Sequence, residues 1–233
     1  MSKTDQRNHF EIVENRYKEE LLKHPPQHVQ DEIKLIVKEI LKRKVAKVID
    51  FGSGNGRLTI PLLQKGLDVV AVDISNKSLA ALQLFAAKNI SQISILSVSN
   101  YIPKGKWHAI VGCDILHHVP LEKTLSEMRR KLKDEKGVII FSEPNIINIS
   151  WLIYVTLFLN WKIEGGMIQC HYFNFISILK RNNFKNITLH GYGIIPPIFL
   201  NSFPILQKIN YFFGNLPLIK LFAYRYIIVA QAD

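Results

Sequence analysis

Three glycines alternate with other residues in a short segment that could bind a ligand. The segment reads Val48-Ile49-Asp50-Phe51-Gly52-Ser53-Gly54-Asn55-Gly56 and lies between an apolar run and a helical pattern. Glycine lets the backbone turn tightly and approach a ligand, and the start of the next helix offers unpaired N–H donors. Asp73 ends the following apolar run, 17 residues after Gly56, where its carboxylate could accept both hydroxyls of a ribose. The pattern indicates a site for an adenosine-containing ligand.

The residues around the glycines favour one adenosine-containing cofactor over another. A dinucleotide site has the pattern G-x-G-x-x-G, but Arg57 occupies the position of the third glycine. Asp50 would also lie near a pyrophosphate, and the two negative groups would repel each other. A carboxylate at this position suits a cationic ligand that carries an amino group. Both observations favour S-adenosylmethionine over NAD.

The elements that must position these residues alternate between apolar strands and amphipathic helices. Helices are predicted over residues 29–41, 57–64, 76–88, 120–132 and 175–181, and strands over 47–51, 67–72, 93–98, 107–112, 137–142, 184–189 and 224–230. Ser75 is a suitable N-cap for the helix that follows it. Continuous apolar strands that alternate with helices predict a doubly wound, mostly parallel α/β sheet of seven strands.

The length of 233 residues favours a single domain. We expect an N-terminal helical segment over residues 1–44, a cofactor-binding core over 45–145 and a closing strand within 221–233. Residues 146–220 break the alternating pattern twice, after strand five and after strand six. We interpret the two breaks as insertions, and the last helix and strand six lie between them. The apolar composition of both insertions predicts a cap on the α/β core.

Four segments resemble the class I S-adenosylmethionine-dependent methyltransferases, in the small-molecule branch of types 11 and 12. Residues 48–56 are similar to motif I of that family, and Val70-Ala71-Val72-Asp73-Ile74-Ser75 to the acidic motif after it. Cys113-Asp114-Ile115-Leu116-His117-His118-Val119-Pro120 resembles the segment after strand four, and Phe141-Ser142-Glu143-Pro144-Asn145 the motif of strand five. The resemblance covers residues 45–145 in the family's order and spacing, and it implies a Rossmann-like methyltransferase fold.

The resemblance also implies roles for the cofactor-binding residues. Asp50 and the glycine turn, with Gly52, Ser53, Gly54 and Gly56, would hold the methionine part of S-adenosylmethionine; Asp73 would bind the ribose, Ile74 would pack on the adenine, and Cys113 would contact the cofactor through its backbone. Relatives often carry an Asp near the end of strand three that accepts the adenine amino group. This chain has Ser97, Ser99 and Asn100 there, of which Ser99 or Asn100 could substitute.

Methyl transfer from a sulfonium is an in-line displacement, so alignment of the reactants and removal of a proton from the acceptor both contribute to the rate. His117 and His118 follow the carboxyl end of strand four, where open α/β sheets place ligands, and either could be the general base. The alternative is a packing role at the start of the next helix, and the sequence does not separate the two histidines.

Two further residues are candidates for binding the substrate or removing its proton. Glu143, at the tip of strand five, could bind or deprotonate the substrate or cap a loop. His171 could cover the pocket, although a structural role in a loop is the simpler interpretation. No His, Cys and Asp residues have the spacing of metal ligands, so no catalytic metal is predicted.

The substrate side is unusually apolar. Residues 151–159 and 194–213 are rich in aromatic and aliphatic side chains close to the predicted site. They could bury one another, line a pocket for an apolar substrate, or face a lipid. We therefore expect methylation of a hydrophobic small-molecule or lipid-like acceptor, on oxygen rather than nitrogen or carbon, by a cytoplasmic enzyme for which peripheral contact with a membrane stays open.

The formal net charge of +11 raises a second candidate function, methylation of RNA or DNA. Many of the cations fall where helices should end, so a solvated basic surface is the favoured interpretation. The segment after strand four also lacks the N/D-P-P-Y/F-type motif of enzymes that modify bases. A third candidate is a non-catalytic binding protein with the same fold, which the intact glycines and acidic residues argue against. The sequence does not indicate an oligomeric state.

Overall fold

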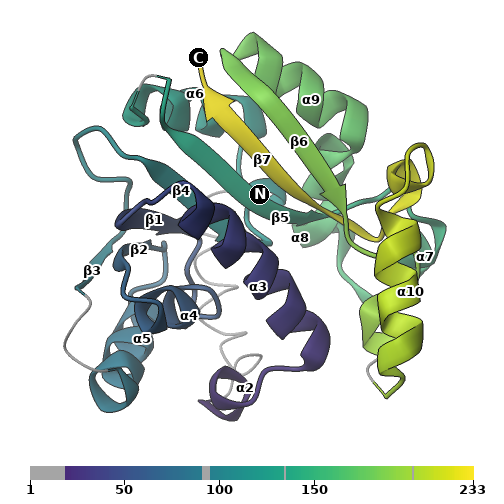
Figure 1. Ribbon diagram of the computed structural model, residues 1–233, viewed down its shortest axis with the longest axis horizontal. Coiled ribbons are helices and arrows are strands. Elements are labelled where there is room, and N and C mark those ends of the chain that lie inside the picture. Colours follow the sequence, from purple (N-terminus) through teal and green to yellow (C-terminus); the bar gives the residue numbers. More distant parts are fainter. Residues whose placement is uncertain (1–18, 91–94, 134, 201) are drawn as a thin grey trace. The chain divides into compact units, whose positions relative to one another are not determined.

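A computed structural model describes residues 19–90, 95–133, 135–200 and 202–233 (Figure 1). Most of the first half of the predicted N-terminal segment and the start of the predicted third strand, residues 93 and 94, lie outside these ranges. The chain divides into two compact units. Among the described residues, the first unit comprises 19–90, 95–113 and 131–133, and the second comprises 114–130, 135–200 and 202–233.

The first unit contains four parallel strands and the helices between them. Its elements are α2 (Glu19–Lys23), α3 (Gln27–Lys42), β1 (Lys47–Phe51), α4 (Thr59–Gln64), β2 (Asp68–Val72), α5 (Asn76–Asn89), β3 (Leu96–Ser99) and β4 (Ala109–Cys113). β1 pairs with β2 and β4, and β2 pairs with β3. The buried apolar runs of β1 and β2 give this unit its core, as expected for parallel strands covered on both faces.

Two helix starts show how local sequence sets the boundaries. The Ser75 hydroxyl accepts a hydrogen bond from the Ser78 amide at 3.1 Å, so the predicted N-cap of α5 is confirmed. α4 begins at Thr59, two residues after the predicted start. The glycine turn extends through Gly56, whose φ of 105° is left-handed, and the chain enters helical geometry only after it.

The second unit contains the other three strands and the helices of both insertions. Its elements are η2 (Leu116–His118), most of α6 (Leu121–Lys131), β5 (Val138–Pro144), α7 (Ile149–Phe158), α8 (Trp161–Glu164), η3 (Gly165–Cys170), α9 (Tyr172–Arg181), β6 (Phe184–Gly191), η4 (Pro197–Leu200), α10 (Pro204–Gly214), η5 (Ile219–Phe222) and β7 (Arg225–Ala232). β7 runs antiparallel to both β5 and β6. Phe141, Phe175 and Tyr226 are the largest side chains that are fully buried in this unit.

The strand order is β3-β2-β1-β4-β5-β7-β6 in one seven-stranded mixed sheet. This confirms the predicted doubly wound α/β fold, with β7 as the antiparallel member. The insertions are more regular than their sequence indicated, because α7, α8 and α10 were not among the predicted helices and α9 starts three residues earlier than expected. No helix within the described part of the chain is long and apolar enough to cross a membrane.

Two asparagines after β5 join this part of the chain to the segments before and after α10. Asn145 follows β5 and donates from Nδ2 to the carbonyls of Leu221 and Ala223, at 3.0 and 2.8 Å. Asn148 caps α7 and donates from Nδ2 to the carbonyls of Ile194 and Phe222, at 2.7 and 2.8 Å. The two side chains therefore provide hydrogen-bond donors for backbone carbonyls of Ile194 and of residues 221–223.

Candidate active site

The glycine turn after β1 requires glycine for two different reasons. Gly52, Gly54 and Gly56 have φ values of 74°, 49° and 105°, a region that other residues rarely adopt. A Cβ on Gly56 would lie 2.5 Å from Cδ1 of Leu82, so this glycine allows close packing against α5. A Cβ on Gly54 would meet no described atom within 4 Å. The backbone at Gly54 thus borders open space that a ligand could occupy.

Asp73 holds the turn from the end of β2. Its Oδ2 accepts a hydrogen bond from the Gly54 amide at 2.8 Å, and its Oδ1 accepts one from the Ser75 amide at 2.9 Å. Burial raises the pKa of Asp73, while the amides of Ser75 and Gly54 oppose that rise. The carboxylate predicted to bind ribose therefore already fixes the shape of the turn.

Asp50 and Ser53 are the polar groups of this site that most need a partner. Asp50 is buried, and its Oδ2 accepts a hydrogen bond from the Thr59 hydroxyl at 2.6 Å. Burial raises the pKa of Asp50 to about 7, because water no longer solvates the charge. The Ser53 hydroxyl is buried and has no hydrogen-bond partner among the described residues. A ligand with a cation and polar groups would satisfy both, so these residues fit S-adenosylmethionine.

The end of β3 separates the two candidates for the adenine amino group. The Ser99 hydroxyl donates to the Tyr101 carbonyl at 2.7 Å and accepts from the Tyr101 amide at 3.2 Å, so local contacts engage it. Asn100 is exposed, and its Nδ2 donates to the Asp73 carbonyl at 3.0 Å and to Oδ1 of Asn76 at 2.8 Å. Those bonds place Asn100 beside Asp73 and use its donor group.

Two other predicted cofactor residues lie at the ends of strands in the same unit. Ile74 directly follows Asp73 and is half-buried, and Cys113 is the last residue of β4 and is also half-buried. Because β1, β2 and β4 are parallel neighbours, Cys113, Ile74 and the glycine turn all follow carboxyl ends of strands. That edge is where open α/β sheets place ligands.

The second unit brings three of the four catalytic candidates together. Oε2 of Glu143 lies 2.6 Å from Nδ1 of His117, while Oε1 accepts hydrogen bonds from the amides of Ile115 and Leu116 at 3.0 and 2.8 Å. The rings of His117 and His118 are 4.0 Å apart. Glu143 thus caps the loop after β4 and orients His117.

His171 makes no hydrogen bond or ion pair to this cluster among the described residues. Its carbonyl accepts a hydrogen bond from the Phe175 amide at the start of α9, at 3.0 Å. Its ring Nδ1 is buried and has no hydrogen-bond partner within the residues that the structure describes.

Glu164 joins the cluster, and sequence reasoning missed it. Its Oε2 lies 3.4 Å from Nε2 of His117 and 4.0 Å from Nε2 of His118. The available signal was composition, since Glu164 is the only acidic residue between positions 145 and 222. A lone carboxylate in so apolar a segment needs a partner. A second ion pair that the sequence did not indicate joins Asp114 to Arg225 in the same unit.

The two adjacent histidines have opposite electrostatic surroundings. Burial disfavours a charge on His117, but the charge of Glu143 and the hydrogen bonds to Glu143 and Glu164 outweigh it and raise the pKa of His117 to about 10. Burial and the positive charge of His117 lower the pKa of His118 to about 4. Burial would raise the pKa of Glu164, but the nearby imidazoles lower it. Near neutral pH, His117 is charged and His118 is neutral.

The same three side chains could in principle hold a cation. One ligand atom each from His117, His118 and Glu164 lies within 4.8 Å of the others. A histidine must be neutral to bind a metal ion, and the raised pKa of His117 favours a proton on it instead. Linear spacing could not reveal this group, because Glu164 lies 46 positions after His118.

Comparisons with known proteins identify the family of this chain. A family described as "Methyltransferase domain" matches residues 22–189. Ubiquinone biosynthesis O-methyltransferase of Idiomarina loihiensis is 28% identical over 127 residues, which are 51% of this chain and 52% of that protein. The enzyme of the same name from Pelagibacter ubique is 28% identical over 104 residues, 44% and 43% of the two chains. The chain thus spans about half the length of the curated relatives it matches.

Solved structures share the fold at low sequence identity. Magnesium protoporphyrin IX methyltransferase from Synechocystis PCC 6803 with bound SAH has a TM-score of 0.63 and 18% identity, with 100% of each chain covered. Phosphoethanolamine N-methyltransferase 2 of Haemonchus contortus in complex with S-adenosyl-L-methionine has a TM-score of 0.58 and 18% identity, over 87% of this chain and 52% of that chain. Likeness at this level establishes the fold and leaves the substrate open.

Proposed function

This chain belongs to the family of S-adenosylmethionine-dependent methyltransferase domains, and we propose that it methylates an oxygen of an apolar, lipid-like small molecule. The main support for S-adenosylmethionine as the cofactor is the structure of the glycine turn. Its open space at Gly54, the unsatisfied hydroxyl of Ser53 and the buried carboxylate of Asp50 suit a cation with an amino group. S-adenosylmethionine supplies an electrophilic methyl group on a sulfonium.

Each residue of the first unit has a role in this proposal. Asp50, with Gly52, Ser53, Gly54 and Gly56, binds the methionine part, and Cys113 contacts the cofactor through its backbone. Asp73 accepts the ribose hydroxyls, and Ile74 packs on the adenine. For the adenine amino group we favour Oδ1 of Asn100 over Ser99, because Tyr101 already engages the donor and one of the two lone pairs of the Ser99 hydroxyl and so fixes its orientation.

The electrostatics of the second unit support different roles for the two histidines. His118, neutral near pH 7, can accept a proton from an acceptor hydroxyl, whereas His117 already holds one. Glu143 and Glu164 fix and charge His117, which makes His117 a positioning residue in this proposal. His171, outside this cluster, has a structural role at the start of α9.

The low basicity of His118 favours an acidic hydroxyl as the acceptor. Moving a proton from a phenol, with a pKa of about 10, to a group with a pKa of about 4 costs about 8 kcal/mol. From a hydroxyl as weakly acidic as water, with a pKa of about 15.7, the cost rises to about 16 kcal/mol. An aromatic hydroxyl on an apolar molecule therefore fits this base better than an aliphatic alcohol. The O-methyltransferases among its relatives agree with oxygen as the accepting atom.

The cofactor assignment is tested by calorimetric titration with S-adenosylmethionine and, separately, with NAD. We expect micromolar binding of the first and none of the second, and at least a hundredfold weaker binding by Asp73→Ala. Asp68→Ala is the matched control, because Asp68 begins the same strand and also accepts a backbone amide, that of Ile95 at 3.0 Å. Equal losses in both variants, or no binding by the wild-type chain, would overturn the assignment.

The acceptor assignment is tested by transfer of a labelled methyl group to apolar phenols and to matched aliphatic alcohols. The phenols should be methylated and the alcohols should not. His118→Asn should lower kcat by about 10²–10⁴-fold, the usual contribution of a general base, while exposed His24→Asn should not change it. Preferred methylation of the alcohols would contradict the proposed acceptor. Full activity of the His118→Asn variant would contradict the role of His118 as the base.

A further inference from the structure

Helix α10 packs with two amide side chains and a glycine inward, while its large apolar side chains are mostly outward. Gln207, Asn210 and Gly214 are its buried residues, and they recur at helical spacing along one face. On the other face Ile205 is 74% exposed and Phe212 is 64% exposed. A surface helix of a globular protein normally shows the reverse arrangement. The outward face of α10 is therefore built for surroundings other than water.

Specific contacts fix this orientation. Oδ1 of Asn210 accepts hydrogen bonds from the amides of Ile194 and Ile195, at 2.8 and 3.0 Å, and its Nδ2 donates to the Ile195 carbonyl at 2.8 Å. Gly214 packs against backbone, because a Cβ there would lie 2.4 Å from the nitrogen of Gly193. Rotating α10 to bury its apolar face would break the three hydrogen bonds of Asn210. It would also replace Gly214 by a larger residue where the backbone of Gly193 leaves no room for a side chain.

Helix α7 adds apolar surface at the same end of the second unit (Figure 1). Val155 is the one buried residue of α7, whereas Ile149 and Phe158 are each 70% exposed. The side chain of Asn148, which caps α7, bonds to carbonyls on both sides of α10 in the chain, those of Ile194 and Phe222. We call the exposed apolar side chains of α7 and α10 the apolar face. Its most exposed members include Ile149, Leu157, Phe158, Ile205 and Phe212.

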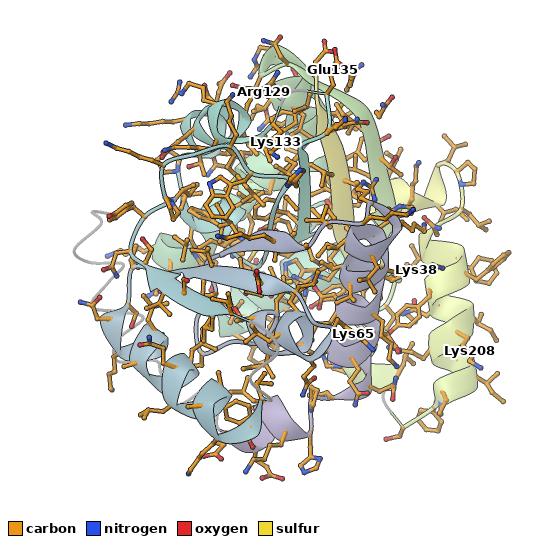
Figure 2. The ribbon with its side chains drawn as sticks, turned by 60° about the vertical axis from the view of Figure 1, so that its left-hand side comes forward. Lys38, Lys65, Arg129, Lys133, Glu135 and Lys208 are labelled. Carbon is orange, nitrogen blue, oxygen red and sulfur yellow. The ribbon has the colours of Figure 1, made fainter. Side chains whose placement is uncertain are left out.

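The exposed charges on α7, on α10 and on the short helix that follows each of them in the chain are positive. Lys208 lies on α10 (labelled in Figure 2), Lys162 on α8 after α7, and the half-buried Lys220 on η5 after α10. Glu164, the only acidic residue between positions 145 and 222, bonds to His117 and is mostly buried. Exposed apolar side chains among lysines without exposed acids match a surface that is apolar inside and anionic at its rim.

We infer that α7 and α10 dock this protein on a bilayer that contains anionic lipids. The helices are 10 and 11 residues long, about 15 Å each, so they reach the interface and cannot cross the hydrocarbon core of about 30 Å. A second copy of the chain would also cover the apolar face, but it would bring lysines against lysines with no acid between them. Charge therefore favours the membrane. Docking would give the enzyme access to a lipid-like acceptor, and only that consequence rests on the proposed function.

Co-sedimentation of the full chain with vesicles tests the docking surface. Vesicles of phosphatidylcholine with phosphatidylglycerol should bind the protein at least tenfold more tightly than phosphatidylcholine alone. The double variant Ile205→Glu/Phe212→Glu should lose at least tenfold in binding. Its control, Leu84→Glu/Ile95→Glu, replaces two apolar side chains that are 72% and 63% exposed in the first unit and should stay within about twofold of wild type.

A second pair of variants isolates the charge. Lys208→Gln should weaken binding to anionic vesicles about fivefold, the usual contribution of one cation near such a surface. Lys38→Gln, at an exposed lysine of α3, should leave it unchanged. Titration of each variant with S-adenosylmethionine reports whether it is folded, so vesicle binding and cofactor binding can fail independently.

Three results would overturn this inference. The first is no binding of the wild-type chain to either vesicle, and the second is an equal loss in the Leu84→Glu/Ile95→Glu control. The third is a wild-type dimer, measured by light scattering, that Ile205→Glu/Phe212→Glu converts to a monomer without any effect on vesicle binding. That third result would assign the apolar face to a second copy of the chain.

Discussion

His117 and His118 are neighbours in the chain but differ in pKa by about six units, from about 10 to about 4. Both rings are largely buried, so burial alone would keep both neutral. His117 faces two carboxylates, whereas His118 lies next to the resulting positive charge. The charge on His117 therefore helps to keep His118 neutral, and Glu143 is the residue on which both states depend.

Replacing Glu143 with Gln should therefore remove a pH-dependent part of the stability. The folded-state pKa of His117 is raised, so its stabilisation is full below about pH 6.5 and is lost as pH rises toward 10. Glu143→Gln should lower the free energy of unfolding by about 3–5 kcal/mol at pH 7, since it breaks a buried ion pair. The deficit should shrink to about 1–2 kcal/mol at pH 9.5. Urea unfolding at both pH values measures it.

Glu122→Gln provides the control for this variant. Glu122 pairs with Arg181 at 3.0 Å on the surface, where both side chains are more than half exposed. Removing an exposed pair should change the free energy of unfolding by less than about 1 kcal/mol at either pH. A deficit of Glu143→Gln that stays constant or grows with pH would show that His117 is not charged in the folded protein.

We expect the ionised Asp50 carboxylate to lower the stability of the protein and to strengthen its binding of the cofactor. Because its folded-state pKa is raised to about 7, ionising it costs stability progressively as pH rises from about 4 to about 7. Asp50→Asn keeps an acceptor for Thr59 and avoids that cost, so its unfolding free energy relative to wild type should rise by roughly 2–3 kcal/mol from pH 5 to pH 8. Its affinity for S-adenosylmethionine should fall at least tenfold. Unfolding and titration at both pH values check this, and unchanged affinity would remove Asp50 from the site.

At the scale of elements, η3 holds η2 in place by direct backbone contact. A Cβ on Gly166 would lie 1.7 Å from the carbonyl oxygen of His117, whereas one on Gly165 would lie 4.0 Å from its nearest atom, Cε3 of Trp161. The pair of glycines therefore occupies very different surroundings although the two are adjacent. Only at Gly166 does the lack of a side chain let the first insertion approach the loop that carries both histidines.

Gly166→Ala should accordingly displace His117 and destabilise the protein by about 1–3 kcal/mol, the usual cost of overpacking. Gly165→Ala, its neighbour, should change stability by less than about 1 kcal/mol. Thermal unfolding compares the two variants, and the pKa of His117 measured by NMR titration should fall in Gly166→Ala only. Equal behaviour of both variants would mean that η3 does not position the histidine.

At the scale of the whole molecule, many cations are already paired with acids. Lys42 and Arg43 pair with Glu39 in the first unit, and Arg181 pairs with Glu122 in the second. Four lysines, Lys34, Lys38, Lys42 and Lys65, line a groove between α3 and α4 that has an apolar floor (Figure 2 labels Lys38 and Lys65). The ion pairs leave the net charge of +11 unchanged, and we expect the remaining basic surface to attract RNA without sequence preference.

RNA retention should be weak and strongly dependent on salt. If four lysines neutralise phosphates, affinity should fall about a hundredfold between about 50 and 200 mM salt. Lys38→Gln/Lys65→Gln should weaken retention at low salt, whereas Leu84→Glu should have a smaller effect. No labelled methyl group should enter the RNA. Filter binding and methyl-transfer assays check both points, and salt-resistant retention with methylation would restore the nucleic-acid function.

The sequence by itself determined the seven-strand pattern, the glycine turn and the two acidic residues around it. These features are local: apolar runs, glycines where φ must be positive, and an N-cap at Ser75 are each set by a few neighbouring residues. For this reason the strands were predicted to within a few residues, and the fold prediction is confirmed.

Only the tertiary structure decided which histidine carries the charge and which way α10 faces. Glu143 and Glu164 reach His117 from 26 and 47 positions away, and a pKa depends on burial and on such distant charges. Likewise, Asn210 turns inward because the backbone of Ile194 and Ile195, 15 or 16 positions earlier, needs hydrogen-bond partners. Hydrophobic periodicity alone would predict that the other face of α10 is buried. It considers only residues within the helix, so it does not include contacts with distant parts of the chain.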